Sequence, residues 1–243
     1  MNEEKFKDKI ILITGGVQGI GLKCAERFLS LGSKVIVTCK SQTSYEHFKK
    51  SSLEKNIQLE KLDLTNEISI DMLHKKLDKL DILINNATIL KGGIEYRIEN
   101  FSDVVNVNLM GLMRICHTFL PKLAISHGNI VNISSVSTKT CIADAPSYSA
   151  TKSAIESLTK SMASCWATHK VRVNCVAPGF IKGNTLNKIL ESYDNNDEIV
   201  KRIPLKRFGF PEEVAEAVMF LTSNGASYIT GSTIFVDGGY SVS

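Results

Sequence analysis

Seven short apolar runs, rich in β-branched residues, recur along the chain and predict seven strands. They cover residues 9–14, 34–39, 57–62, 81–86, 129–134, 171–176 and 232–236. Several of these runs are apolar at successive positions and do not alternate with polar residues. This pattern is typical of strands that are buried on both faces, as they are in a parallel sheet.

Longer stretches with helical periodicity lie between the runs, at residues 19–31, 66–79, 101–125, 147–168 and 211–222. Pro211 and the two glutamates after it mark a helix start, because proline suits the first turn and acids suit the positive end of the helix dipole. The alternation of strands and helices predicts right-handed crossovers in a doubly wound α/β sheet, with helices on both faces. We therefore expect a single domain over residues 1–243 with about seven parallel strands.

Residues 183–203 interrupt this alternation with a polar, loosely patterned stretch. Two interpretations remain open from the sequence. The segment is either a mobile lid over the substrate or an excursion of the chain on the surface.

Composition narrows the class of protein. The chain has 243 residues, of which 43% are hydrophobic and 22% charged, with a net charge of +4. It has no cluster of basic residues with interleaved aromatics, so we expect no nucleic-acid partner. The polar start of the sequence and the lack of an apolar run of about 18 residues argue against secretion and against a membrane span. The six cysteines and five histidines are scattered, which predicts reduced thiols, no metal site and a cytoplasmic location.

A glycine-rich turn connects the first predicted strand to the first predicted helix, with the spacing T-G-x-x-x-G-x-G. Glycine allows a tight turn and a close approach to a ligand, and the N–H groups of the helix start favour a phosphate. We expect this turn to bind the pyrophosphate of a dinucleotide; the alternative is a turn that only permits close packing. The expected contacts are Thr14, Gly15, Val17, Gln18, Gly19, Ile20 and Gly21.

The end of the second predicted strand bears on the choice of dinucleotide. An acid at this place would bind the ribose hydroxyls of NAD, but the chain has Lys40 and Ser41 there. A cation and a hydroxyl suit a 2′-phosphate, so we favour NADP(H) over NAD(H). Asp63, which ends the third predicted strand, either accepts from the adenine amino group or caps the following helix.

A tyrosine and a lysine four residues apart, Tyr148 and Lys152, lie on the same face of a predicted helix. Ser135 ends the fifth predicted strand, 13 residues before the tyrosine. In open α/β sheets, ligands bind outside the carboxyl ends of the strands. The three side chains are therefore expected to converge at that edge.

These motifs together resemble the classical short-chain dehydrogenase/reductase family over essentially the whole chain. The resemblance rests on TGGVQGIG, Asp63, NNA at 85–87, Asn108 in NVNLMG, Ser135, YSATK, PG at 178–179 and VDGG at 236–239. It implies a Rossmann-type fold, an NAD(P) cofactor and a homotetramer or homodimer. It also implies a catalytic tetrad of Asn108, Ser135, Tyr148 and Lys152. Further cofactor contacts that it implies are Leu64, Asn85, Ala87, Pro178, Gly179 and Ile181.

Two positions depart from the family pattern. Thr88 stands where the family usually continues NNA with glycine, and Gly183 falls near the place of a threonine that contacts the nicotinamide amide. The backbone of Ile181 and the side chain of Thr185 are the alternative contacts at that end of the cofactor.

Hydride transfer to a ketone leaves an alkoxide that must gain a proton, and Tyr148 is placed to supply it. A free phenol has a pKa of about 10. An ammonium about 4 Å away contributes roughly 4 kcal/mol at an effective dielectric near 20, which opposes the effect of burial. We expect Lys152 to lower the pKa of Tyr148 and, by resemblance, to hold the nicotinamide ribose.

The other two members of the implied tetrad have supporting roles. Ser135 is expected to bond the substrate oxygen, as an oxyanion donor does. Asn108 is implied to orient a water that passes protons to Lys152; its alternative role is an asparagine bonded to backbone within a helix.

We therefore expect an NAD(P)(H)-dependent oxidoreductase that interconverts a small-molecule ketone and a secondary alcohol. One alternative is a 3-oxoacyl-carrier-protein reductase, which needs basic residues for its acidic carrier. Ser126 and His169 stand where that branch often has arginine, although Lys201, Arg202 and Arg207 could serve. The other alternative is a non-catalytic dinucleotide-binding sensor or scaffold.

Overall fold

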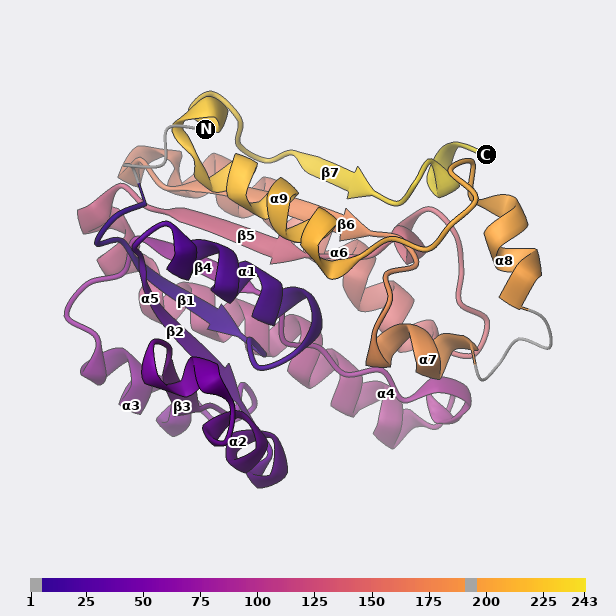
Figure 1. The fold of residues 1–243 in the computed structure, drawn as a ribbon, viewed down its shortest axis with the longest axis horizontal. Helices are drawn as coiled ribbons and strands as arrows, with labels where there is room; N and C mark the ends of the chain where they lie inside the picture. Colours follow the sequence, from indigo (N-terminus) through magenta and orange to yellow (C-terminus); the bar gives the residue numbers. More distant parts are fainter. Residues whose placement is uncertain (1–5, 191–195) are drawn as a thin grey trace.

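One parallel sheet of seven strands forms the centre of the molecule (Figure 1). The computed structural model describes residues 6–190 and 196–243. The strands are β1 Ile10–Thr14, β2 Lys34–Cys39, β3 Gln58–Lys61, β4 Ile82–Asn85, β5 Asn129–Ile133, β6 Arg172–Pro178 and β7 Thr233–Val236. Each falls on one of the seven predicted runs, so the predicted fold class is confirmed.

The spatial order of the strands is β3-β2-β1-β4-β5-β6-β7, with every neighbouring pair parallel. The chain therefore moves outward from β1 to β3, returns to the centre and moves outward again from β4 to β7. The order in which successive strands are added to the sheet therefore reverses between β1 and β4. In such a sheet, helices that follow neighbouring strands there leave on opposite faces and open a crevice at the carboxyl ends.

Helices cover both faces of the sheet (Figure 1). One face carries α1 Gly19–Ser30, α2 Gln42–Lys49 and α9 Pro211–Thr222, and the other carries α3 Glu67–Lys76, α5 Leu112–Ser126 and α6 Pro146–Trp166. The strands supply both cores because successive side chains point to opposite faces. In β1, Ile11 and Ile13 belong to the core under α1, whereas Leu12 belongs to the core under α5.

The predicted helix 101–125 is in fact three segments. α4 Ile98–Val105 leads into a π-helical turn, Asn106–Gly111, which leads into α5. A Cβ at Gly111 would lie 2.7 Å from the Cβ of Leu64, so glycine is needed where the π-helical turn crosses the end of β3. Hydrophobic periodicity could not indicate this, since one extra residue in a turn leaves the apolar pattern nearly unchanged.

Three helices were not predicted. α2 is mostly polar and buries only Phe48, with its first turn capped by Ser41. The stretch 183–203 contains α7 Asn184–Leu190 and α8 Asn196–Arg202, while residues 191–195 of the expected lid lie outside the described residues. Within the described ranges, no helix is long and apolar enough to cross a membrane.

A buried carboxylate joins the amino ends of three central strands. Asp81, 3% exposed, accepts a hydrogen bond from the backbone N–H of Ile10 at 3.0 Å and pairs with Lys9 at 2.9 Å and Lys79 at 3.1 Å. Its carbonyl also accepts from the N–H of Asn129 at 3.0 Å. Burial raises the pKa of Asp81, but these hydrogen bonds and cations outweigh it, and the pKa lies below its ordinary 3.8.

Replacing this carboxylate with an amide, Asp81→Asn, should lower the free energy of unfolding by about 2 kcal/mol at neutral pH, because a buried charge-assisted network is broken. A group with a depressed folded pKa stabilises above its unfolded pKa, and this contribution is lost as the pH falls through the folded pKa. The deficit of the variant should therefore shrink below pH 3.8. Urea unfolding over a pH series measures this, with exposed Asp78→Asn as the control. A deficit that is constant with pH would contradict the assignment.

Candidate active site

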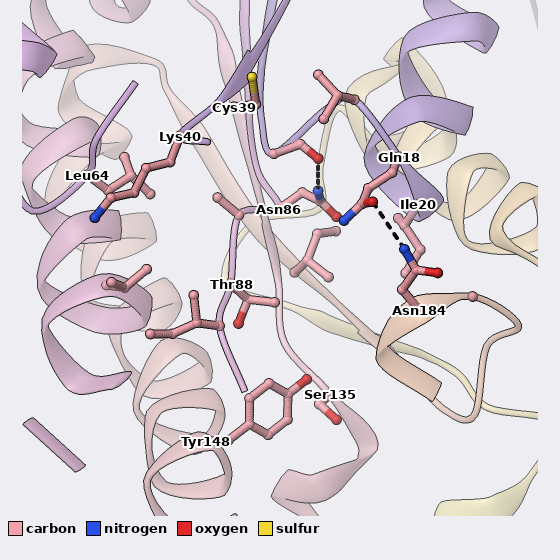
Figure 2. Close-up of a pocket in the computed structure, with 18 of the residues that line it drawn as sticks. Gln18, Ile20, Cys39, Lys40, Leu64, Asn86, Thr88, Ser135, Tyr148 and Asn184 are labelled. Carbon is pink, nitrogen blue, oxygen red and sulfur yellow. Dashed lines mark hydrogen bonds between the residues drawn. The ribbon is translucent and has the colours of Figure 1, made fainter. Parts of the chain in front are cut away.

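A cavity of about 800 Å³ opens at the carboxyl ends of β1, β2, β4, β5 and β6, at the reversal of strand order. Figure 2 shows Lys40 and Leu64 on one side of it, Gln18 and Asn184 on the opposite side, and Tyr148 with Ser135 at one end. Most of the predicted site residues line this cavity. They are Gly15, Val17, Gln18, Gly19, Ile20, Lys40, Ser41, Asp63, Leu64, Ala87, Ser135, Tyr148, Lys152, Pro178, Gly179 and Ile181.

The glycine-rich turn has the shape that a phosphate-binding turn needs. Gly15 and Gly19 have φ of +63° and +54°, which favour glycine. A Cβ at Gly15 would lie 2.9 Å from the Cα of Ala87, whereas one at Gly19 would meet nothing within 4 Å. The backbone is thus packed against β4 on one side and faces open space at the start of α1. A helix N-terminus with no acid in its first turn favours an anion there.

The loop after β4 is fixed to this turn by hydrogen bonds. The hydroxyl of Thr14 accepts from the N–H groups of Asn86 and Ala87, both at 3.0 Å. The Asn86 side chain donates to the carbonyls of Thr14 at 3.1 Å and Gly15 at 3.0 Å. Thr14 therefore does not line the cavity but positions residues that do.

Asn86, and not the predicted Asn85, lines the cavity from this loop. The Asn85 side chain points to the other face of the sheet, where it donates to Asn132 at 2.8 Å and to the Cys116 sulfur at 3.0 Å. The alternation of a strand puts neighbours on opposite faces, but the exact end of β4 decides which asparagine faces the cavity. The sequence carried no signal for that end.

Lys40 and Asp63 face each other across the far end of the cavity. The Lys40 ammonium lies 2.9 Å from the Asp63 carboxylate, which also accepts from the N–H and hydroxyl of Thr65. Burial raises the pKa of Asp63, but the hydrogen bonds from Thr65 and Lys40 hold it below its usual range. The prediction that Asp63 caps the following helix is wrong, because Asn66 caps α3. The Ser41 hydroxyl caps α2 by accepting from the Ser44 N–H at 3.1 Å.

Tyr148, Ser135 and Lys152 converge at the carboxyl end of β5. Figure 2 shows the Tyr148 hydroxyl beside Ser135. The Lys152 ammonium lies 5.4 Å from the centre of the Tyr148 ring and donates to the Ile133 carbonyl at 2.8 Å. Tyr148 and Lys152 are 6% and 3% exposed. The predicted helical step thus places the phenol and the ammonium side by side.

The predicted lowering of the Tyr148 pKa is not found in the protein alone. Burial raises the pKa of Tyr148 to about 12, against the lowering effect of the hydrogen bond with Ser135. Burial also lowers the pKa of Lys152 from 10.5 to about 8. Removal from water penalises the charged form of both groups, and here it outweighs their attraction.

Asn108 lies in the π-helical turn, outside the cavity lining. Its side-chain oxygen accepts from the N–H of Ile89 at 2.8 Å, and its amide nitrogen donates to the Ile89 carbonyl at 2.9 Å. The side chain is thus bonded to backbone, but in a distant segment and not within its own helix. It fixes Ile89, which lines the cavity.

The segment after β6 borders the cavity on the side opposite Lys40. Gly183, with φ of +143°, precedes α7, and the side chain of Asn184 donates to Gln18 at 3.2 Å (Figure 2). Leu186 of α7 also lines the cavity. The side chain of Thr185, expected as an alternative contact, lies outside the described residues.

The arrangement fits a nicotinamide dinucleotide. The cavity joins an anion-favouring helix N-terminus, a polar end with Lys40, Ser41 and Asp63, and a phenol beside a buried ammonium. The Lys152 ammonium can donate three hydrogen bonds, and one goes to Ile133. Its other hydrogens can serve ribose hydroxyls.

Known proteins match the chain over nearly its full length. The family model described as "Enoyl-(Acyl carrier protein) reductase" matches residues 15–241. The 3-oxoacyl-[acyl-carrier-protein] reductases of Rickettsia typhi and Aquifex aeolicus are 38% and 39% identical, over 96% and 98% of this chain and 97% and 99% of theirs. The dehydrogenase/reductase SDR family member 6 of Aquarana catesbeiana is 33% identical, over 98% of this chain and 99% of its own.

A solved structure also matches the fold of nearly the whole chain. The ligand-free aldohexose dehydrogenase of Thermoplasma acidophilum matches with a TM-score of 0.87 and 32% identity, over 99% of this chain and 96% of that one.

The glycine-rich turn generates a testable prediction. A Cβ at Gly21 would lie 2.5 Å from the Asn86 amide nitrogen and 2.7 Å from the Gly15 carbonyl oxygen. The added methyl group of Gly21→Ala should displace the Asn86 side chain and the Gly15 carbonyl. We expect overpacking to destabilise the fold by about 1–3 kcal/mol and the displaced turn to bind a dinucleotide more weakly. Calorimetric titration with NADPH measures the binding. Gly93→Ala, where the Cβ meets nothing within 4 Å, is the control. Equal affinity in both variants would contradict the role of this turn.

Proposed function

The chain belongs to the short-chain dehydrogenase/reductase family, in the branch that resembles 3-oxoacyl-[acyl-carrier-protein] reductases, and from this premise we propose which residues carry its reaction. It is an NAD(P)-dependent oxidoreductase that interconverts a ketone and a secondary alcohol. We propose Tyr148 as the general acid and base, with Ser135 and Lys152 beside it. The observation that carries this proposal is the buried phenol, whose hydroxyl lies beside Ser135, with the Lys152 ammonium 5.4 Å from its ring (Figure 2).

The proton chemistry follows from the state of Tyr148. With a pKa of about 12, the phenol is protonated at neutral pH and is ready to donate to an alkoxide. Ser135 and Tyr148 together would hold the substrate oxygen, as oxyanion donors do. The nicotinamide ring, when bound, supplies or accepts the hydride. Lys152 would hold the nicotinamide ribose and stabilise the phenolate that remains after proton transfer.

The role of Asn108 is less direct than the resemblance implies. Its side-chain amide is bonded on both sides to the backbone of Ile89. We propose that it supports the proton relay to Lys152 by fixing the loop and the π-helical turn around the site. A π-helical turn inside a helix is a frequent feature of functional sites.

We propose NADP(H) as the preferred cofactor. The supporting residues are Lys40, Ser41 and Ser44, which line the cavity at the ends of β2 and the start of α2. The pairing of Lys40 with Asp63 holds the ammonium at the mouth of this end, where it can meet a 2′-phosphate.

The substrate that we propose is a small-molecule ketone or the corresponding alcohol. Apolar Ile89, Phe180 and Leu186 line the cavity, and Ile89 packs against the cluster that contains Tyr148. Of the cations considered for an acidic carrier, Arg207 is paired with Glu213 at 2.6 Å, and Arg202 lies 5.0 Å from the Tyr240 ring centre. A 3-oxoacyl thioester on a carrier protein is the second candidate, favoured by the activity for which the bacterial relatives are named.

We also propose a cytoplasmic homo-oligomer, either a dimer or a tetramer. The strand β7 forms an edge of the sheet, and its unpaired backbone groups are a template for pairing with another chain. Exposed Phe220, Tyr228 and Val242 lie in the segments on either side of this strand.

The catalytic assignment predicts the effect of removing one oxygen atom. Tyr148→Phe should lower kcat by about 10²–10⁴-fold, the usual contribution of a general acid, and should leave the affinity for NADPH within about threefold. NADPH consumption against a panel of ketones and a free acetoacetyl thioester measures this, and the fully exposed Tyr228→Phe is the control. Tight NADPH binding without turnover of any carbonyl by the wild type would favour the sensor interpretation.

The cofactor assignment predicts that removing the charge of Lys40 weakens the binding of NADPH but not that of NADH. Lys40→Met should weaken NADPH binding by about tenfold or more, since one charge-assisted hydrogen bond contributes about 1.5–3 kcal/mol, and should change NADH binding little. Calorimetric titration with each cofactor measures both affinities. The exposed Lys160→Met removes the same charge elsewhere and is the control. Equal losses for NADPH and NADH, or a wild type that prefers NADH, would contradict the assignment.

A further inference from the structure

One buried carboxylate has no place in the reaction described above. The charged residues that are buried in the described part of the chain are Asp81, Glu95 and Lys152. Asp81 joins strand ends, and Lys152 belongs to the site. Glu95 is 0% exposed and follows a short 3₁₀ turn, Gly92–Ile94, in the loop between β4 and α4. A carboxylate that is removed from water must be compensated, so its partners indicate its role.

The partners of Glu95 lie at the start of the helix that carries Tyr148. One carboxylate oxygen accepts from the Ser147 hydroxyl at 2.5 Å and from the backbone N–H of Tyr148 at 2.9 Å. The other oxygen accepts from the N–H of Lys91 at 2.8 Å. The carboxylate thus connects its own loop to the first turn of α6.

The α6 helix lacks a capping side chain of its own. The residue before its first turn is Ala145, which offers no side-chain acceptor, and Pro146 begins the helix. The first N–H groups of a helix have no partner within the helix, and the positive end of its dipole favours an anion. Glu95 supplies both the acceptor and the charge from more than 50 positions earlier in the sequence.

We propose that Glu95 is a positioning residue for the reaction, which caps α6 through Ser147 and Tyr148 and so fixes the phenol against Ser135. The proposal rests on the proposed function of Tyr148. It adds a residue that touches no substrate and that acts through the backbone of the residue doing the chemistry.

The same carboxylate bears on the proton chemistry. The ionisable groups beside Tyr148 on the packed elements are Lys152 of α6 and Glu95 of the β4–α4 loop, and the Ser135 side chain lies beside the phenol at the end of β5. The negative charge of Glu95 raises the pKa of Tyr148, in addition to the larger effect of burial. Removing that charge while keeping the shape should therefore lower the pKa of the phenol. A cap with only a structural role would not cause this shift.

The substitution Glu95→Gln separates these effects. The amide can present only one oxygen, so either the start of α6 or the Lys91 N–H loses its acceptor. We expect amide hydrogen exchange in the first turn of α6 to accelerate about tenfold or more in the cofactor-free protein. We expect kcat for ketone reduction to fall about tenfold, and its alkaline limb to move to lower pH. NADPH affinity should stay within about twofold, because the hydrogen bonds of Glu95 reach neither the glycine-rich turn, nor Lys40, nor Lys152.

The control is Glu99→Gln, which removes the same charge from an exposed position four residues away in the first turn of α4. It should leave the exchange rates, kcat and the pH profile unchanged. If both variants behave alike, a general loss of charge explains the result and the proposal is overturned.

A second variant covers the case in which Glu95→Gln does not fold. Ser147→Ala removes one of the two contacts of Glu95 with α6 and leaves the charge in place. It should accelerate amide hydrogen exchange at the start of α6 and lower kcat about threefold, and the pH dependence of kcat should not change. Unchanged exchange and kcat would overturn the proposal.

The exchange measurement needs no turnover, so the proposal and the proposed function can fail separately. If Tyr148→Phe retains activity, the function assigned to Tyr148 is wrong whatever Glu95→Gln does. If Tyr148→Phe is inactive while Glu95→Gln accelerates exchange but changes neither kcat nor its pH profile, Glu95 is a structural cap only and the positioning role is overturned.

Discussion

The ammonium of Lys152 is buried at the carboxyl end of β5, where it donates to the Ile133 carbonyl and lies against the ring of Tyr148. Burial lowers its pKa to about 8 and raises that of the phenol to about 12. Both charged forms are therefore costly in the protein alone. Burial is the largest cause of the raised pKa of Tyr148, and the buried negative charge of Glu95 raises it further.

In the doubly wound sheet, contacts that stabilise the fold lie at the amino ends of the strands, and the candidate site lies at their carboxyl ends. At the amino ends, Asp81 with its backbone and lysine partners holds β1, β4 and β5 in register. At the carboxyl ends, glycine backbone, Thr14 and Asn86 form an open cavity at the reversal of strand order. A parallel sheet brings the ends of successive strands to one edge, so residues far apart in sequence share one site.

The strands and long helices could be predicted because burial on one or two faces leaves a periodic pattern. The short α2 could not, because it buries only Phe48 and leaves almost no apolar pattern. The short α7 and α8 lie in a polar, loosely patterned stretch of the sequence. The π-helical turn at Asn106–Gly111 was missed for a related reason. The turn lies close to Leu64 at Gly111, which is a contact between distant segments.

The sequence by itself determined the fold class, the tight glycine-rich turn between β1 and α1, and the shared face of Tyr148 and Lys152, because these depend on local periodicity and spacing. Only the tertiary structure decided that Asn86 faces the cavity, that Lys40 pairs with Asp63, and that Glu95 caps α6. It also decided the direction in which the pKa of Tyr148 is shifted. The physical reason is that burial, and the choice of partner for a buried polar group, are set by segments that the chain brings together only when it folds.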